Sequence, residues 1–128
     1  MNFRGYHGLT VWNRAVDLVE LIYHLTTELT ASAPPEVLTA MRRSALALPT
    51  HLASGFQTPS TLTYLRHVHA AQLSLGEIET HLVILNRLQW ADTEDTQRLQ
   101  SLLTHLDQLL GCLERYLAEE SPSTLPES

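Results

Sequence analysis

Apolar side chains recur at intervals of three and four residues along most of the chain, which is the spacing of one face of an α-helix. The first such stretch runs from about 9 to 30. Its apolar positions are Leu9, Trp12, Ala15, Val16, Leu18, Val19, Ile22, Tyr23, Leu25 and Leu29. This spacing predicts an amphipathic first helix.

Two consecutive prolines separate the first stretch from a second, and Pro35 suits the first turn of a helix, where its missing N–H needs no partner. The second helix is predicted over 35–54, and Gly55 is expected to end it in a left-handed conformation. Its core positions are Leu38, Met41, Ala45, Leu48 and Leu52. Pro49 lies inside this pattern, where proline removes a donor at a cost of about 3 kcal/mol, so a kink is expected between Ala45 and Pro49.

A third helix is predicted over about 59–89, with Thr58 or Ser60 as its cap and Pro59 near its first position. We expect it to be the longest helix. Its inward positions are Thr61, Tyr64, Val68, Ala71, Leu75, Ile78, Leu82 and Leu85.

The fourth helix is predicted over about 92–119, where Asp92 can cap its start and Glu94 and Asp95 favour the positive end of its dipole. Its inward row is predicted to be Leu99, Leu102, Leu106, Leu109 and Leu113. A second row of Leu103, Leu110 and Leu117 is expected to stay partly exposed. That extra row suggests a surface for a partner.

Four helices joined by short turns predict an all-α fold, an antiparallel up-down-up-down four-helix bundle with a proline kink in its second helix. A chain of 128 residues is long enough for one such domain, over 1–120. The segment 121–128 is rich in proline and serine, so we expect a flexible tail.

The net charge of −6, from 14 acidic and 8 basic residues, opposes general binding to nucleic acid. The arginines are scattered, and only Arg42 and Arg43 are adjacent, which leaves a local patch open. The first residues lack the apolar run of a secretion signal, and no later stretch is apolar enough to span a membrane, so we expect neither a secretion signal nor a membrane span. A single cysteine, Cys112, lies among leucines and is expected to be buried and reduced. These features favour a soluble, cytoplasmic protein.

Bundle proteins that hold two iron ions use a Glu followed three residues later by His on each of two helices, and no such pair occurs in this sequence. Glu20 and His24, and likewise Glu77 and His81, are four residues apart, which is typical of a surface pair. We therefore expect no bound metal and no other cofactor.

His67 and His69 flank Val68 and point in different directions on a helix, so they cannot hold one ion without help from another chain. One of them is expected to face a helix or subunit interface. Cys112, in a leucine-rich helix, is a poor nucleophile. No phosphate-binding loop appears either, so the sequence disfavours an enzyme.

Charged residues on the second and third predicted helices suggest polar contacts between elements. We predict that Arg42 pairs with Glu79 between helices, or that Arg43 and Glu77 meet across subunits. Such pairs would fix register and specificity more than net stability.

Three segments, in order, resemble one protein family: Leu9 to Ala15, Met41 to Phe56, and Ser74 to Leu82. The chain is similar to the 23S rRNA-intervening sequence protein family of bacteria, whose relatives include accessory proteins of diversity-generating retroelements. The resemblance implies a four-helix bundle with Trp12, Pro49 and Gly55 as structural landmarks. It also implies a homo-oligomer, a ring of five copies.

A second hypothesis follows from the retroelement relatives, which bind a reverse transcriptase and nucleic acid. On this hypothesis Arg42, Arg43 and Arg66 line the lumen of a ring and contact RNA. The family usually reads Asn-Ile-Ala-Glu-Gly followed by basic residues, whereas this chain has His51-Leu52-Ala53-Ser54-Gly55 without them. We therefore rank nucleic acid as the less favoured partner.

The favoured hypothesis is a non-enzymatic, self-associating scaffold or adaptor protein that binds copies of itself and a further protein partner. The aromatic residues Tyr6, Trp12 and Trp90 offer apolar area for an interface.

Overall fold

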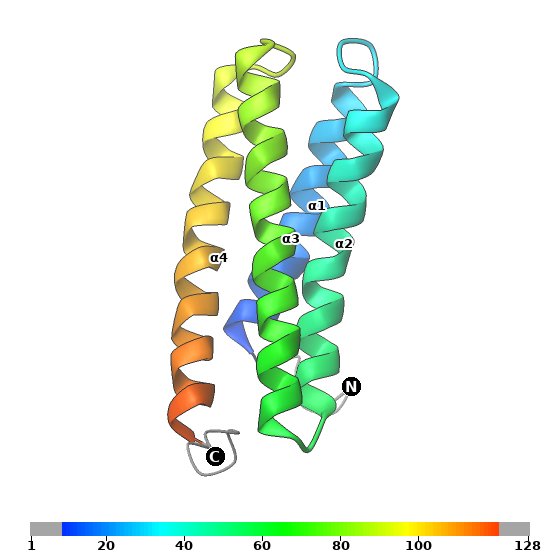
Figure 1. Ribbon diagram of the computed structural model, residues 1–128. Coiled ribbons are helices and arrows are strands. Elements are labelled where there is room, and N and C mark those ends of the chain that lie inside the picture. The colour runs from blue at the N-terminus through cyan, green and yellow to red at the C-terminus, as the bar shows by residue number, and fades with distance from the viewer. Residues whose placement is uncertain (1–8, 121–128) are drawn as a thin grey trace.

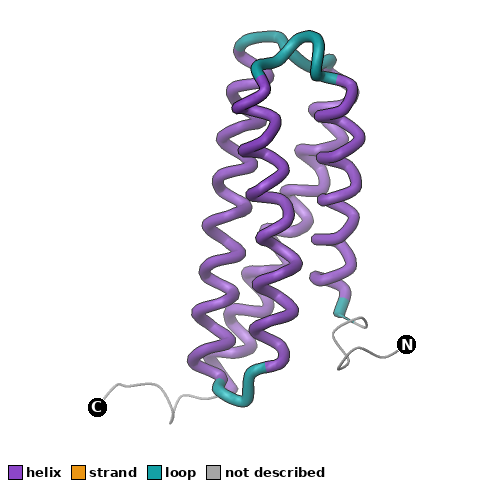
Figure 2. Tube along the Cα trace, turned by 90° about the vertical axis from the view of Figure 1, so that its right-hand side faces the viewer, coloured by secondary structure: helices purple, strands orange, loops and turns teal. Residues whose placement is uncertain are grey.

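The chain forms a bundle of four helices (Figure 1), and the computed structural model describes residues 9 to 120 of it. The helices are α1 (Thr10–Glu28), α2 (Pro35–Gln57), α3 (Thr61–Arg87) and α4 (Thr93–Glu120), and residues 9 to 120 contain no strand. Successive helices run in opposite directions, as Figure 2 shows from the side. The predicted all-α, up-down-up-down fold is confirmed. Tyr6 and the predicted tail at 121–128 lie outside the described residues.

Each helix packs against two neighbours, in the order α1 with α2, α2 with α3, α3 with α4, and α4 with α1. The α2 and α3 pair makes the most extensive contact and the α1 and α4 pair the least. The prediction that the third helix is the longest is wrong by one residue, because α3 has 27 residues and α4 has 28.

The core is a column of leucines with isoleucine and methionine between the four helices. Its largest fully buried side chains are Leu18, Ile22, Met41, Leu48, Leu52, Leu75, Ile78, Leu82, Leu85, Leu99, Leu103 and Leu106. Full burial of one such side chain contributes roughly 1.5–3 kcal/mol, so this column is the main source of stability. Burial on α1 is centred on Ala15, Leu18 and Ile22, and Tyr23, predicted to face inward, is 37% exposed.

The helix starts follow the predicted capping residues. The Ser60 Oγ accepts a hydrogen bond from the Thr63 N–H at 3.1 Å, and the Asp92 Oδ1 accepts one from the Asp95 N–H at 3.0 Å. Each satisfies a backbone donor that the first turn of a helix leaves unpaired. Pro35 is the first residue of α2, as its missing N–H favours.

Gly55 does not end α2, contrary to the prediction from sequence, because the helix continues to Gln57. The glycine is buried where α3 comes close to α2. A Cβ built on Gly55 would lie 2.7 Å from the Tyr64 Cδ1 and 3.0 Å from the His67 Cβ. The absence of a side chain therefore lets the two helices approach at this level.

Pro49 lies within α2, and the helix is continuous on both sides of it. Its partly buried ring borders a shallow depression between α1 and α2, together with Trp12 and Val16. The neighbouring Thr50 hydroxyl donates a hydrogen bond to the Leu46 carbonyl at 2.9 Å. The kink between Ala45 and Pro49 stays a prediction.

The predicted inward row of α4 is confirmed for Leu99 and Leu106 and wrong for its other members. The buried residues are Thr96, Leu99, Leu103, Leu106, Leu110 and Leu117. Leu102, Leu109 and Leu113, predicted to face inward, are only partly buried against the core. Leucine at every one of these positions leaves the hydrophobic pattern nearly symmetric, so packing against α1 and α3 decides which row turns inward.

Candidate interaction surfaces

Arg42 of α2 is held against α1. Its Nε donates a hydrogen bond to the Thr26 Oγ1 at 2.7 Å, and a terminal nitrogen donates to the Thr27 Oγ1 at 3.3 Å. The guanidinium carbon also lies 4.8 Å from the centre of the Tyr23 ring, a cation–π geometry. The predicted pair of Arg42 with Glu79 is therefore wrong, because Thr26 and Thr27 take the guanidinium to the opposite flank of α2.

Both threonine hydroxyls are free to accept from Arg42 because each donates its own proton to α1. The Thr26 Oγ1 donates to the Ile22 carbonyl at 2.7 Å, and the Thr27 Oγ1 donates to the Tyr23 carbonyl at 2.8 Å. The result is a small hydrogen-bonded network at the α1 and α2 seam, which holds the positive charge of Arg42 in place.

Arg43, next in sequence, is exposed and forms no ion pair within the part of the chain that the structure describes. It borders a depression of about 360 Å³ with Tyr23, Thr39, Arg42 and Leu46. Leu46 is 46% exposed, so apolar surface lies beside the two cations. We call Tyr23, Arg42, Arg43 and Leu46 the basic face.

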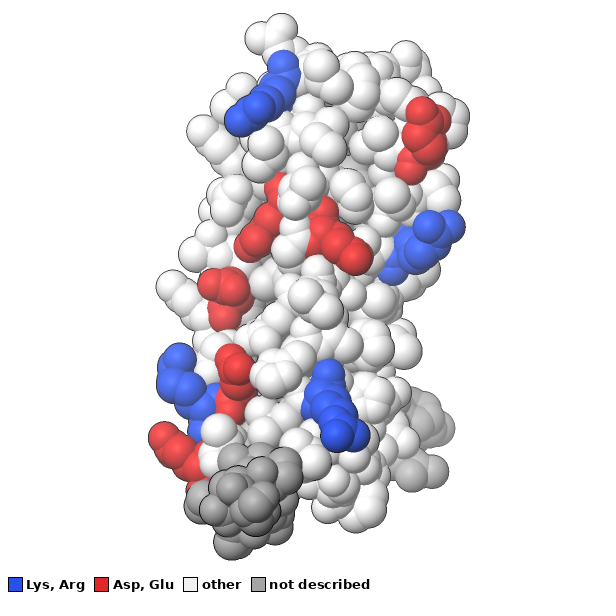
Figure 3. All heavy atoms as spheres, viewed as in Figure 1, with Lys and Arg blue, Asp and Glu red and all other residues white. Residues whose placement is uncertain are grey.

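The opposite side of the bundle, where α3 meets α4, carries uncompensated negative charge. Burial raises the pKa of the Glu79 carboxyl, and repulsion from Asp107 of α4 raises it further. No described arginine lies within ion-pair distance of either carboxylate. Figure 3 shows acidic side chains near mid-height of this side of the molecule. We call Glu79, Asp107 and the exposed Val83 the acidic face.

Glu77 lies on α3 toward α2, where its Oε1 accepts a hydrogen bond from the buried Ser44 hydroxyl at 2.8 Å. This contact links α2 to α3 within one chain. The pairing of Arg43 with Glu77 across subunits stays a prediction.

The outward side of α3 is unusually apolar for a helix that borders solvent. Leu73 is 72% exposed and Val83 49%, and Leu88, directly after the helix, is 53% exposed. Between them lies Gly76, and a Cβ built there would meet no other described atom within 4 Å. The glycine is therefore not required by packing inside the chain.

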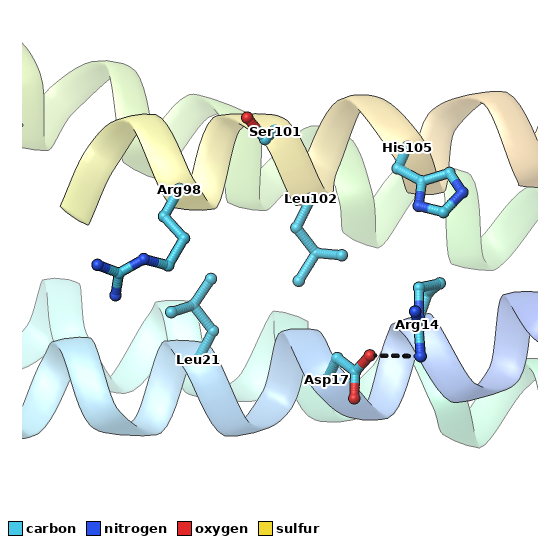
Figure 4. Close-up of a pocket in the computed structure, with 7 residues that line it drawn as sticks. All are labelled: Arg14, Asp17, Leu21, Arg98, Ser101, Leu102 and His105. Atoms are coloured by element: carbon cyan, nitrogen blue, oxygen red, sulfur yellow. Dashed lines mark ion pairs between the residues drawn. The ribbon is translucent and has the colours of Figure 1, made fainter. Parts of the chain in front are cut away.

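A groove of about 450 Å³ runs between α1 and α4 (Figure 4). Leu21 and Leu102 point toward each other across it, with Arg98 near one end and Arg14 near the other. Arg14 pairs with Asp17 at 2.8 Å, and its buried Nε has no hydrogen-bond partner among the described residues. Leu102, one of the partly buried leucines of α4, lines this groove.

Another polar link joins α3 to α4. The Gln72 amide donates a hydrogen bond to one Glu114 oxygen at 3.1 Å, and the His69 Nε2 lies 2.9 Å from the other. These two bonds, the one from Gln72 first, lower the pKa of the Glu114 carboxyl. His69 is thus a partner of α4, whereas Arg66 is exposed near the start of α3.

Cys112 is exposed, which corrects the prediction that it is buried. An Arg115 terminal nitrogen donates a hydrogen bond to its Sγ at 3.4 Å.

Within residues 9 to 120, no serine, threonine or cysteine side chain is hydrogen-bonded to a histidine, and no three metal-ligating side chains converge. No helix in that range is long and apolar enough to cross a membrane.

Sequence reasoning missed a histidine pair between α2 and α3. The His51 Nδ1 lies 3.2 Å from the His67 Nδ1, and the ring centres are 5.5 Å apart. The prediction that His67 or His69 faces a helix interface is confirmed for both residues. Only the antiparallel register of α2 and α3, which sequence spacing does not reveal, brings His51 to His67.

In a comparison with protein families, residues 7–112 match the model described as 23S rRNA-intervening sequence protein. The chain belongs to this family. No curated protein matches the chain. The matched region covers α1 to α3 and most of α4, so the family relationship extends over nearly the whole bundle.

The three landmark residues of the family resemblance lie inside the matched region. Trp12 is partly buried against the core at the start of α1, and Pro49 borders the same depression from α2. Gly55 lies at the close contact of α2 with α3. All three occupy helix contacts.

Proposed function

We propose that this protein is a non-enzymatic scaffold or adaptor that works as an assembly of identical copies. The observation that carries the proposal is a pair of complementary faces on opposite sides of one bundle. The basic face lies where α1 meets α2, and the acidic face lies where α3 meets α4.

Faces on opposite sides of one chain cannot neutralise each other, but the basic face of one copy can meet the acidic face of the next. Such a head-to-tail contact produces a closed ring when its rotation closes. A ring of five copies is the form that the family resemblance implies, and the complementary faces support a ring without fixing its number.

The apolar side chains beside the charges are important to this proposal. An exposed ion pair contributes only about 0–1 kcal/mol, so charge alone would hold copies weakly. Leu46 and Tyr23 flank Arg43 on the basic face, while Val83 flanks Glu79 on the acidic face. Burial of these side chains would supply most of the association free energy, and the charges would select the orientation.

The test is the mass of the assembly by sedimentation equilibrium, with the substitutions Arg43→Glu and Asp107→Arg. Each single reversal is expected to weaken association, because it places like charges opposite each other. The double variant restores opposite charges and is expected to recover assembly. Arg115→Glu, which alters an exposed arginine outside both faces, serves as the charge-matched control.

Two results would contradict the proposal at different levels. A wild-type chain that sediments as a monomer at micromolar concentration would refute self-association itself. Assembly that survives both single reversals unchanged would refute these two faces while leaving self-association in place.

A second candidate function is RNA binding, favoured by the fixed Arg42 beside the unpaired Arg43. Arg66 does not join them, because it lies near the start of α3, beside the end of α2, whereas Arg43 lies in the first half of α2. An electrophoretic assay with structured RNA at increasing salt tests this function. Loss of one phosphate contact in Arg43→Ala is expected to reduce the salt slope by about 0.7–0.9.

A further inference from the structure

The two Nδ1 atoms of His51 and His67 face each other across the α2 and α3 seam at 3.2 Å. One hydrogen bond can join two neutral imidazoles, since one nitrogen donates and the other accepts. Both side chains are only partly buried, so the pair is close to the surface. The two nitrogens are thus brought together by separate helices and remain within reach of solutes.

The surrounding contacts fix the spacing of the pair. Gly55, one turn after His51 on α2, allows the backbone of α2 to come within van der Waals distance of Tyr64 and His67 on α3. The Phe56 and Tyr64 rings then meet edge to face with centres 6.3 Å apart. These contacts set the distance between the two helices, and hence between the two imidazoles, before any ligand arrives.

No described aspartate or glutamate forms an ion pair or hydrogen bond with either ring. Burial lowers the pKa of His51, and the nearby His67 lowers it further. A carboxylate, which would favour the charged imidazole, is missing from the contacts of the pair. An unprotonated imidazole nitrogen is the form that binds metal ions.

We propose that His51 and His67 together bind one divalent transition-metal ion, of the zinc, copper or nickel class, through their Nδ1 atoms. Zinc binds imidazole nitrogen at about 2.0–2.1 Å in tetrahedral geometry, which places two ligand nitrogens about 3.3 Å apart. The observed separation of 3.2 Å matches this spacing without movement of either helix. Water completes the coordination, because no third ligand converges on the pair within residues 9 to 120.

The sequence-based expectation of no metal considered pairs of side chains on one helix, and this pair comes from two. An ion bound there would join α2 to α3 next to their closest contact. It would therefore stabilise the folded chain by an amount that rises with the logarithm of the metal concentration, because the unfolded chain does not hold the two nitrogens together.

The experiment is a Zn²⁺ titration of the full chain, prepared without a histidine tag, by calorimetry at neutral pH. One ion per chain is expected, with binding that weakens below about pH 6 as protons compete for the imidazoles. His51→Asn and His67→Asn are each expected to weaken binding at least about tenfold, because even loss of an outer-shell partner costs that much. His24→Asn, an exposed histidine on α1, is the matched control.

A second measurement uses the wild-type chain alone, in case a variant fails to fold. Nitrogen-detected NMR of the seven histidines should show zinc-dependent shifts at the Nδ1 atoms of two of them. Absence of binding at millimolar Zn²⁺, or equal binding by wild type and both pair variants, would overturn the proposal. Shifts spread over other histidines would overturn it as well.

Discussion

Replacement of Gly55 by alanine tests the close approach of α2 to α3 most directly. The new Cβ would lie 2.7 Å from the Tyr64 ring and 3.0 Å from the His67 Cβ, and the second of these atoms is fixed to the α3 backbone. The two helices must therefore separate by a few tenths of an ångström. Overpacking of this kind typically costs about 1–3 kcal/mol.

Alanine also favours a helix over glycine by about 0.5–1 kcal/mol, which offsets part of that cost. The difference of the two effects leaves an expected net loss of up to about 2.5 kcal/mol for Gly55→Ala. For a chain of this length, 1 kcal/mol corresponds to a Tm change of about 4 °C, so a decrease of up to about 10 °C is expected.

Gly76→Ala is the matched control, because its Cβ meets no other described atom within 4 Å. The only expected effect is the higher helix propensity of alanine than of glycine, so Gly76→Ala is expected to be more stable than wild type by about 0.5–1 kcal/mol. Urea unfolding and thermal melts at one fixed protein concentration give both values. A Gly55→Ala chain that gains as much stability as the Gly76→Ala chain would refute the argument that α2 and α3 need this glycine.

Three further outcomes are expected. Hydrogen bonds from Gln72 and His69 lower the pKa of Glu114 in the folded chain. The ionised Glu114 therefore stabilises the fold above the pKa that it has in the unfolded chain, and this stabilisation is lost as the pH falls through its pKa in the folded chain. Glu114→Gln should remove this pH dependence from the free energy of unfolding measured in urea. Burial first, and repulsion second, raise the pKa of Glu79, so Glu79→Gln should stabilise the chain at neutral pH and lose that advantage in acid. Arg42→Ala should cost about 1–3 kcal/mol in the same assay, because it strips a buried hydroxyl of a charged donor.

Most of the fold follows from the sequence because helix spacing and capping chemistry are local. Ser60 and Asp92 begin α3 and α4 through bonds made within three residues, and such signals need no knowledge of the tertiary structure. The leucine rows of α4 show the limit of prediction from local sequence. Because positions 102 and 103 are both leucine, hydrophobicity alone does not show which side chain faces the core.

The glycine of α2 shows a second limit. A glycine near the end of a helical pattern is consistent with a left-handed stop or with close packing, and Gly55 serves the second purpose. The neighbouring element decides between the two.

The polar contacts were the least predictable part of the surface. The Arg42 side chain is long and flexible, and its partners depend on which flank of α2 faces α1, so the sequence pattern favours Glu79 whereas the structure pairs Arg42 with Thr26. His51 and His67 are sixteen residues apart on different helices, and only the register of α2 against α3 brings them together.

Because α1 packs against α4 in the antiparallel sense, the beginning of α1 and the end of α4 lie at the same end of the molecule (Figure 1). The four helices therefore form a closed circle of neighbours, in which only α4 and α1 are packed together without being joined by a loop. A circular permutant that joins residue 120 to residue 10 with a short linker, and is opened between α2 and α3 or between α3 and α4, keeps every helix beside its original neighbours. The order in which the helices are synthesised can thus be changed without changing the core.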